Sequence, residues 1–188
     1  MRLLILAWSL LFLCGPAPAA ERDRPFIDEP EPATTEGFED EGRGWKEAAT
    51  NLPPWPNDGD LIEFSVDGSP RFRYYIDGRH ISVGTDGAVR YTLVVVSRSG
   101  ARNLSFEGLR CTPNGAFKIY AYGNQGRFER TEGDWIRIRE RRHDKLHRDL
   151  HREILCRPLE FEPRSRRDML HAMRARTPDA ANTGFLPD

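Results

Sequence analysis

Three histidines follow one another at four-residue spacing late in the chain. On an α-helix, His143, His147 and His151 would lie along one face. Two histidines at this spacing can chelate zinc. The Glu of a His-Glu-x-x-His frame is missing, however, and the three residues also flank the apolar stripe of an amphipathic helix. The sequence favours a helix flank over a metal site, and it predicts no cofactor.

An arginine-rich run comes just before these histidines. Such a run can bind phosphate groups. However, isoleucines alternate with its first members, which is typical of arginines on the solvent-exposed face of a strand. The net charge of −1 and the pI near 6.5 do not provide the electrostatic footprint of a nucleic-acid binder. We therefore expect no nucleic-acid partner, and an acidic envelope polymer or a lipid head group stays open. The run comprises Arg137, Arg139, Arg141 and Arg142.

The motifs of common catalytic classes are missing from the sequence. It contains no Gly-x-Ser-x-Gly elbow, phosphate loop or Gly-x-Gly-x-x-Gly fingerprint. Asp77, Asp86 and Glu107 could pair as carboxylates, but the two aspartates belong to Asp-Gly pairs, which use aspartate for backbone reasons. We predict no catalytic residue.

Residues 1–19 have the layout of a secretory signal peptide. A basic residue precedes an apolar run, and small residues follow near Ala19. The run is too short to cross the roughly 30 Å of bilayer hydrocarbon, and no later stretch is apolar enough to do so. Cys14 leaves a lipoprotein anchor open, because lipoproteins are cut just before a cysteine. The residue before that cysteine is usually small, however, and here it is Leu13. We expect export with cleavage near Ala19.

Cleavage would leave two cysteines, Cys111 and Cys156. An even count in an exported chain indicates a disulfide. In the chain-entropy model, closing a loop of this length stabilises a fold by about 4 kcal/mol. A catalytic thiol and a zinc site are the alternatives, but neither cysteine belongs to a Cys-x-x-Cys pair.

Composition divides the mature chain into three parts. Residues 20–44 are acidic, rich in proline and glycine, and poor in large apolar groups, which predicts a disordered linker. A folded domain is expected over 45–162. A short helix and a frayed tail are expected over 163–188.

Short apolar runs separated by turn signals predict an antiparallel sheet. Asp-Gly and Asn-Gly pairs ending at Gly68, Gly78, Gly87 and Gly115 supply the positive φ that tight hairpins require. Apolar residues alternate along the intervening runs, as in half-buried strands. In the run 104–111 the parity of the apolar residues changes, which predicts a β-bulge at Gly108.

The apolar spacing then changes from two residues to four. Leu146, Leu150 and Ile154 predict a helix over about Asp144–Leu155, which should end at or before Cys156 so that its sulfur can reach the sheet. The expected fold is α+β in a single domain, with a curved antiparallel sheet of six to eight strands packed by a C-terminal helix.

Several long blocks of this sequence resemble one known family. Together they are similar to the cryptic-neisserial-protein-like family, exported bacterial proteins without an assigned molecular function. The resemblance covers roughly residues 45–158 and implies a Gram-negative envelope setting. It carries over no catalytic residue, and the three-histidine helix is not part of the motif. The blocks are Tyr74–Asp77, Ser82–Leu93, Asn103–Cys111 and Ile119–Ala121, with Trp135 and Cys156.

Taken together, these features predict a periplasmic, non-enzymatic module that binds an envelope protein or polymer, or supports the envelope. The candidate binding surface is the sheet face that carries Arg73, Tyr75 and Arg90. An enzyme acting on an envelope component is the alternative. A deep pocket lined by converging groups with perturbed pKa values would indicate it.

Overall fold

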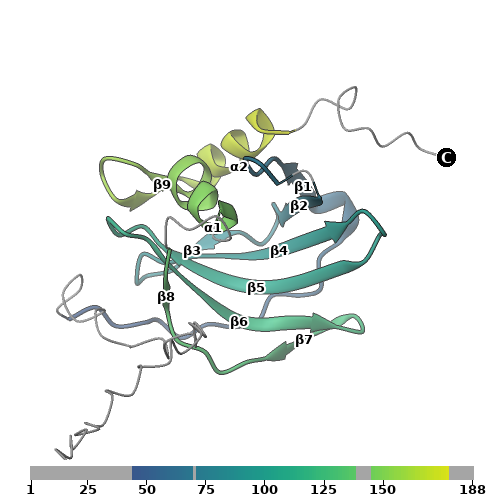
Figure 1. The fold of residues 1–188 in the computed structure, drawn as a ribbon. Helices are drawn as coiled ribbons and strands as arrows, with labels where there is room; N and C mark the ends of the chain where they lie inside the picture. The colour runs from purple at the N-terminus through teal and green to yellow at the C-terminus, as the bar shows by residue number, and fades with distance from the viewer. Residues whose placement is uncertain (1–43, 70, 139–144, 178–188) are drawn as a thin grey trace, which may run out of the picture. The chain divides into compact units, whose positions relative to one another are not determined.

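The computed structural model describes residues 44–69, 71–138 and 145–177, which are built around an eight-stranded sheet (Figure 1). The strands follow the order β1-β2-β4-β5-β6-β7, while β3 pairs with β4 and β8 pairs with β6. Each of these pairs is antiparallel, so the predicted fold class is confirmed. The strands are β1 (Leu61–Phe64), β2 (Phe72–Asp77), β3 (Ser82–Val83), β4 (Val89–Ser97), β5 (Arg102–Arg110), β6 (Ala116–Asn124), β7 (Arg127–Arg130) and β8 (Ile136–Arg137), and a short 3-10 helix η1 (Asp58–Asp60) precedes them.

The turn glycines have two different physical roles. Gly68, Gly87 and Gly115 have φ values of 64°, 76° and 62°, so the expected left-handed conformation is confirmed there. Gly78 does not adopt a positive φ. A Cβ at Gly78 would lie 2.6 Å from Cδ1 of Ile62, so glycine there leaves room for that side chain without any demand from torsion.

The C-terminal elements cover one face of the sheet, which we call the helix face. The predicted helix is present over its described part and ends before Cys156, as expected, with a π-helical second half. A two-stranded hairpin and a capped helix follow, and Ser165 accepts a hydrogen bond from the Asp168 amide at the start of that helix. The elements are α1 (Lys145–Asp149), η3 (Leu150–Leu155), β9 (Cys156–Arg157), β10 (Glu162–Pro163) and α2 (Arg166–Ala175).

The main hydrophobic core lies between the helix face and these helices. Both Met169 and Met173 of α2 are fully buried in it, so α2 belongs to the folded domain although it follows residue 162. The sheet contributes Tyr74, Ile76, Val89, Tyr91, Leu93 and Leu109, and the π-helix contributes Leu150, Ile154 and Leu155.

Strand β5 is buried on both faces, which explains the change of parity in its sequence. Leu109 lies in the main core, whereas Phe106 belongs to a second, smaller core on the opposite face, which we call the outer face. Pairing with β4 is regular throughout residues 102–109, so the bulge predicted at Gly108 is wrong. The irregularity lies in β6, where Tyr120 has no partner in the register with β5.

Residues 45–57, which we call the N-terminal segment, cross the outer face. Trp45 donates from Nε1 to a backbone carbonyl in the β3–β4 turn at 2.8 Å. The Glu47 carboxylate accepts hydrogen bonds from Lys118 Nζ at 3.0 Å and from the Tyr120 hydroxyl at 2.8 Å, both on β6. The segment therefore covers part of a sheet face that would otherwise be open to solvent.

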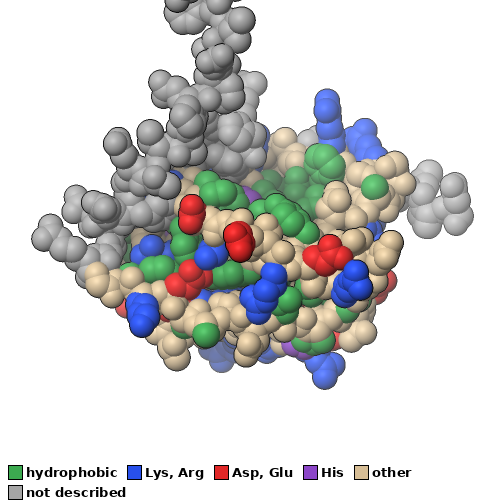
Figure 2. Space-filling view, turned by 90° about the horizontal axis from the view of Figure 1, so that it is seen from below, with side chains coloured by type: hydrophobic (Ala, Val, Ile, Leu, Met, Phe, Trp, Pro, Cys, Tyr) green, Lys and Arg blue, Asp and Glu red, His purple; other side chains and the backbone are tan. Residues whose placement is uncertain are grey.

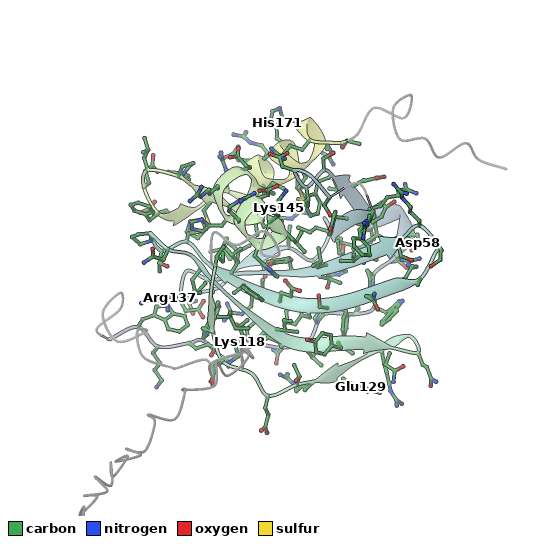
Figure 3. All side chains as sticks on the ribbon, viewed as in Figure 1. Asp58, Lys118, Glu129, Arg137, Lys145 and His171 are labelled. Atoms are coloured by element: carbon green, nitrogen blue, oxygen red, sulfur yellow. A yellow bond between two sulfur atoms is a disulfide. The ribbon has the colours of Figure 1, made fainter. Side chains whose placement is uncertain are left out.

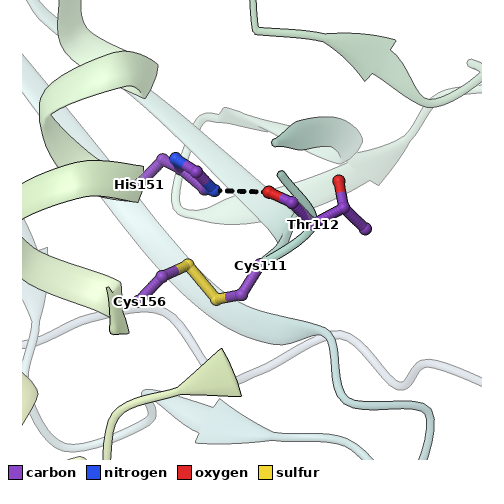
Figure 4. The surroundings of a disulfide bond; sticks show 4 residues. All are labelled: Cys111, Thr112, His151 and Cys156. Carbon is purple, nitrogen blue, oxygen red and sulfur yellow. Dashed lines mark hydrogen bonds between the residues drawn. A yellow bond between two sulfur atoms is a disulfide. The ribbon is translucent and has the colours of Figure 1, made fainter. Parts of the chain in front are cut away.

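The predicted disulfide joins Cys111 to Cys156, with a Cα–Cα distance of 5.5 Å (Figure 4). It ties the end of β5 to β9, directly after the π-helix. Beside it, His151 Nε2 donates to the Thr112 carbonyl oxygen at 3.0 Å (Figure 4). The sheet and the helical layer are thus linked covalently and by a hydrogen bond at the same place.

Candidate binding surface

Glu107 lies beneath the helices, with only 2% of its surface exposed. Ser105 Oγ donates to its Oε1 at 2.5 Å, and the Tyr91 hydroxyl and His147 Nε2 each lie 3.0 Å from its Oε2. The His147 ring stacks on Phe117 with ring centres 3.5 Å apart. This network ties α1 to the sheet through a buried carboxylate whose hydrogen-bonding capacity is used by protein groups.

The protonation states within this network follow from its geometry. Burial acts to raise the pKa of the Glu107 carboxyl, but the hydrogen bond and charge of His147 and the hydrogen bonds from Ser105 and Tyr91 lower it overall. Burial, reinforced by the nearby carboxylate, raises the pKa of the Tyr91 phenol well above its usual value. A carboxylate and a histidine at this distance can act as a general base, but here their side chains are only 3% and 14% exposed.

His147 and His151 do not converge on a common point. His147 reaches Glu107, whereas His151 donates to the carbonyl oxygen of Thr112. Burial lowers the pKa of the His151 imidazole, although the hydrogen bond to Thr112 acts in the opposite direction. His143 lies outside the described residues, and within the described part of the chain no three His, Cys, Asp or Glu side chains gather as a metal site would require.

Arg90 was predicted on the exposed surface, but the structure places it under the N-terminal segment with 6% of its surface exposed. Its guanidinium donates to the two carboxylate oxygens of Asp86 at 2.6 and 2.9 Å and to Thr50 Oγ1 at 2.7 Å. The prediction that Arg90 belongs to the binding surface is therefore wrong, because Arg90 is the covered partner of an ion pair. The alternation of residues along β4 correctly identifies its face, but it does not reveal that a distant segment crosses that face.

The other candidate carboxylates also have structural roles. Burial acts to raise the pKa of Asp86, but the hydrogen bonds from Arg90 and from the backbone amides of Ala48 and Ala88 hold it well below its usual value. Asp77 accepts hydrogen bonds within its own turn, from the Arg79 amide at 2.9 Å, and it contacts His80 at 2.7 Å. Both aspartates therefore organise turns, as Asp-Gly pairs commonly do.

Arg73 and Tyr75 remain on an accessible part of the outer face. Arg73 makes a two-pronged contact with Glu63 at 2.8 and 3.0 Å, and its guanidinium lies 5.3 Å from the centre of the Tyr75 ring. Partial burial, together with the charge of Glu63, raises the pKa of the Tyr75 phenol. These two residues are the part of the predicted surface that a ligand can reach.

An open groove of about 660 Å³ continues this surface toward the β6–β7 turn. The register places Arg102 in the same cross-strand row as Arg73, with Val96 of β4 between them. Asp58 in this groove lies at the opposite end of the sheet from Arg137 of β8 (Figure 3). The groove is lined by an indole, amides and one ion pair, contributed by Trp55, Asn57, Asp58, Arg102, Asn124 and Gln125.

Sequence analysis missed this groove because its lining comes from three separate parts of the chain. Residues 55–58, 102–104 and 123–126 meet only when β5, β6 and the N-terminal segment come together. Two signals were available in the sequence, namely Trp55 within a proline-rich segment and the Gln125-Gly126 pair between two strands. Neither of them predicts which other residues will lie beside it.

A second concavity of about 530 Å³ lies between the turn at 66–69 and the start of α1. It is lined by Phe72 and Lys145, and by Ser69 and Tyr74, whose hydroxyl oxygens are 2.7 Å apart. Arg137, the one member of the arginine-rich run that the structure describes, lines neither concavity. It lies opposite Ala116 on β6, and the other three arginines lie outside the described residues.

The curved antiparallel sheet, with helices on one face and an N-terminal segment across the other, defines an α+β protein of one sheet and one helical layer. The chain belongs to the CNP1-like family, whose model matches residues 40–174. This match confirms the family that the sequence blocks resemble. Comparison with curated proteins and with solved structures finds no match. Among the described residues, no helix is both long and apolar enough to cross a membrane.

Proposed function

We propose that this protein is exported to the periplasm of a Gram-negative cell, where it acts as a non-enzymatic module that binds an envelope component. Its binding surface would be the accessible outer face with Arg73 and Tyr75, continued by the groove at Trp55 and Arg102. The observation that carries this proposal is the contrast between the two faces. The Glu107–His147 pair is largely covered by the helices, with side-chain exposures of 3% and 14%, whereas the aromatic and charged groups of the outer face stay accessible.

Two features support the exported location. Residues 1–19 have the pattern of a cleavable leader. The Cys111–Cys156 bond is of a kind that persists in oxidising compartments such as the periplasm. Mass spectrometry of the protein purified from envelope extract tests this part of the proposal. A mature chain beginning near Ala20 is expected, a lipid-modified Cys14 at the N-terminus would support the anchored alternative, and an intact leader would contradict cleavage.

The binding function is tested by sedimentation of the mature protein with purified peptidoglycan sacculi and with outer-membrane vesicles. We expect it to sediment with one of these fractions, and we expect the Arg73→Ala/Tyr75→Ala variant to lose about tenfold in affinity. Arg174→Ala on α2 is the matched control, because Arg174 is an exposed arginine on the helical layer. Sedimentation with neither fraction would overturn the proposal. Release of soluble fragments from sacculi, lost in Glu107→Gln, would favour the enzymatic alternative.

A further inference from the structure

The geometry points to a neutral glycan strand, made of uncharged hexose or N-acetylhexosamine units, as the ligand of the groove between the N-terminal segment and the β6–β7 turn. This inference rests on the proposed binding function and adds the chemical class of the ligand. Three features of the groove carry it: a fixed indole, an amide-bearing turn in a strained conformation, and an ion pair that cancels the charge of the groove.

The indole of Trp55 is held in place before any ligand arrives. A Cβ at Gly123 would lie 3.0 Å from Cη2 and Cζ3 of the indole, so the absence of a side chain on β6 lets the ring settle on the backbone. Phe128 of β7 supports the ring, with ring centres 5.5 Å apart. Even so, 37% of Trp55 remains exposed. A fixed and partly exposed indole offers an apolar surface to the C–H face of a sugar ring without loss of side-chain entropy on binding.

The β6–β7 turn carries two amide side chains, Asn124 and Gln125. Gln125 adopts a left-handed conformation with φ of 48°, followed by Gly126 with φ of 83°. Asparagine or glycine tolerates this conformation better than glutamine does, so the local backbone does not favour Gln125. Asn124 donates from Nδ2 to Glu129 Oε1 at 3.1 Å, and by strand alternation these two side chains lie on the face opposite Phe128, so the amide that remains for the groove is that of Gln125. An amide at the rim of a groove both donates and accepts, as hydroxyl and acetamido groups require.

The charges inside the groove cancel each other. Arg102 donates to both carboxylate oxygens of Asp58, at 2.8 and 3.3 Å. A phosphate or sulfate polymer would have to compete with Asp58 for Arg102, whereas a hydroxyl group can accept from Arg102 and donate to Asp58. Viewed from below, the molecular surface also shows acidic and basic side chains interspersed among apolar ones (Figure 2). Nothing in this arrangement selects a strongly anionic polymer over a neutral one.

The size of the groove agrees with a ligand of which a short part binds there. About 660 Å³ is within the range of small-molecule sites, roughly 300–1,000 Å³. The groove lies open along the surface, next to the accessible Arg73 and Tyr75. An extended strand can therefore run beyond the groove along this surface, whereas a compact ligand would stay within the groove.

Titration of the mature chain with chitotetraose and cellotetraose tests the inference, with the Trp55 indole N–H resonance as the readout. We expect this resonance to shift with at least one tetrasaccharide, and we expect Trp55→Ala to bind about tenfold more weakly or worse. Phe72→Ala is the matched control, because Phe72 is an exposed aromatic residue in the other concavity. It should bind as the unaltered protein does.

A second variant keeps the inference falsifiable even if Trp55→Ala folds poorly. Gln125→Gly relieves the unfavourable conformation and removes the amide, so we expect its melting temperature not to fall while its affinity for the tetrasaccharide does. Unchanged affinity in Gln125→Gly would contradict the assigned role of the turn.

The remaining outcomes separate the glycan inference from the proposed function. If the protein sediments with sacculi or outer-membrane vesicles through Arg73 and Tyr75, but neither tetrasaccharide shifts the Trp55 resonance, the glycan inference fails and the binding function stands. A shift caused by dextran sulfate and not by the tetrasaccharides would likewise overturn the choice of a neutral ligand.

Discussion

Arg90 and Asp86 form an ion pair, 2.6 Å at its shortest, that lies beneath the N-terminal segment, with side-chain exposures of 7% and 1%. Thr50 and Ala48 of that segment bind the same two side chains. The pair therefore fixes both the β3–β4 turn and the chain that passes over it. A covered pair of this kind contributes through its complete set of hydrogen bonds more than through charge attraction alone.

Removing one partner of this pair should be strongly destabilising. We expect Asp86→Ala to lower the free energy of unfolding by about 3–5 kcal/mol, because Arg90 would stay covered without its counter-charge. Urea denaturation measures the change. The exposed pair of Glu63 and Arg73 is the matched control, and Glu63→Ala should cost no more than about 1 kcal/mol. Equal effects of the two substitutions would show that cover by the N-terminal segment does not matter.

The disulfide should account for a large share of the stability. Replacing both Cys111 and Cys156 with serine should lower the free energy of unfolding by about 4 kcal/mol, because the unfolded chain gains the entropy of an open loop of 45 residues. Chemical denaturation of the variant and of the reduced wild-type protein should agree. A thiol assay on the denatured, unreduced mature chain should find neither cysteine free, and two free thiols would refute the bond.

Stability should fall in acid because of two covered carboxylates. The pKa values of Asp86 and Glu107 are both lowered in the fold from ordinary values of 3.8 and 4.5. Folding therefore favours their ionised forms, and the stabilisation is complete above about pH 5 and is lost as the pH falls through the lowered values. Denaturation midpoints between about pH 5 and pH 2 measure this loss. Glu107→Gln should flatten the profile, and an unchanged slope would contradict the assignment.

His151 should add a separate pH dependence nearer to neutrality. Burial lowers its pKa from the ordinary value of 6.5, so the unfolded chain binds a proton more readily than the folded chain. Its contribution is complete above about pH 6.5 and decreases as the pH falls from there toward the lowered value. The difference in melting temperature between wild type and His151→Gln, measured at several pH values, gives the pH-dependent contribution of His151 to stability. A difference independent of pH would exclude this effect.

Strand β5 should tolerate truncation poorly on either face. Leu109→Ala in the main core and Phe106→Ala in the outer-face core should each lower the free energy of unfolding by about 2–5 kcal/mol, because each leaves a cavity. Leu159 is 91% exposed, and Leu159→Ala should change the free energy of unfolding by less than about 0.5 kcal/mol. Denaturation curves of the three variants test this, and a mild effect of Phe106→Ala would mean that the outer face lacks a packed core.

Local chemistry was enough to predict the main elements of this fold. Alternating apolar residues, Asp-Gly turns and a four-residue apolar spacing specify strands and a helix through interactions between near neighbours. The pairing of Cys111 with Cys156 also followed, because it is the one intrachain bond available once a leader with Cys14 is removed. The family resemblance was confirmed for the same reason, since it rests on contiguous blocks of sequence.

What the sequence by itself determined was therefore the α+β class, the antiparallel sheet, the helix that ends before Cys156 and the disulfide. Tertiary structure alone decided which groups a ligand can reach. It covered Arg90 with residues 45–57, buried Glu107 beneath the helices and left Trp55 partly open beside Gln125. The physical reason is that exposure depends on contacts between segments far apart in the chain, and no local pattern of residue types encodes which segments will meet.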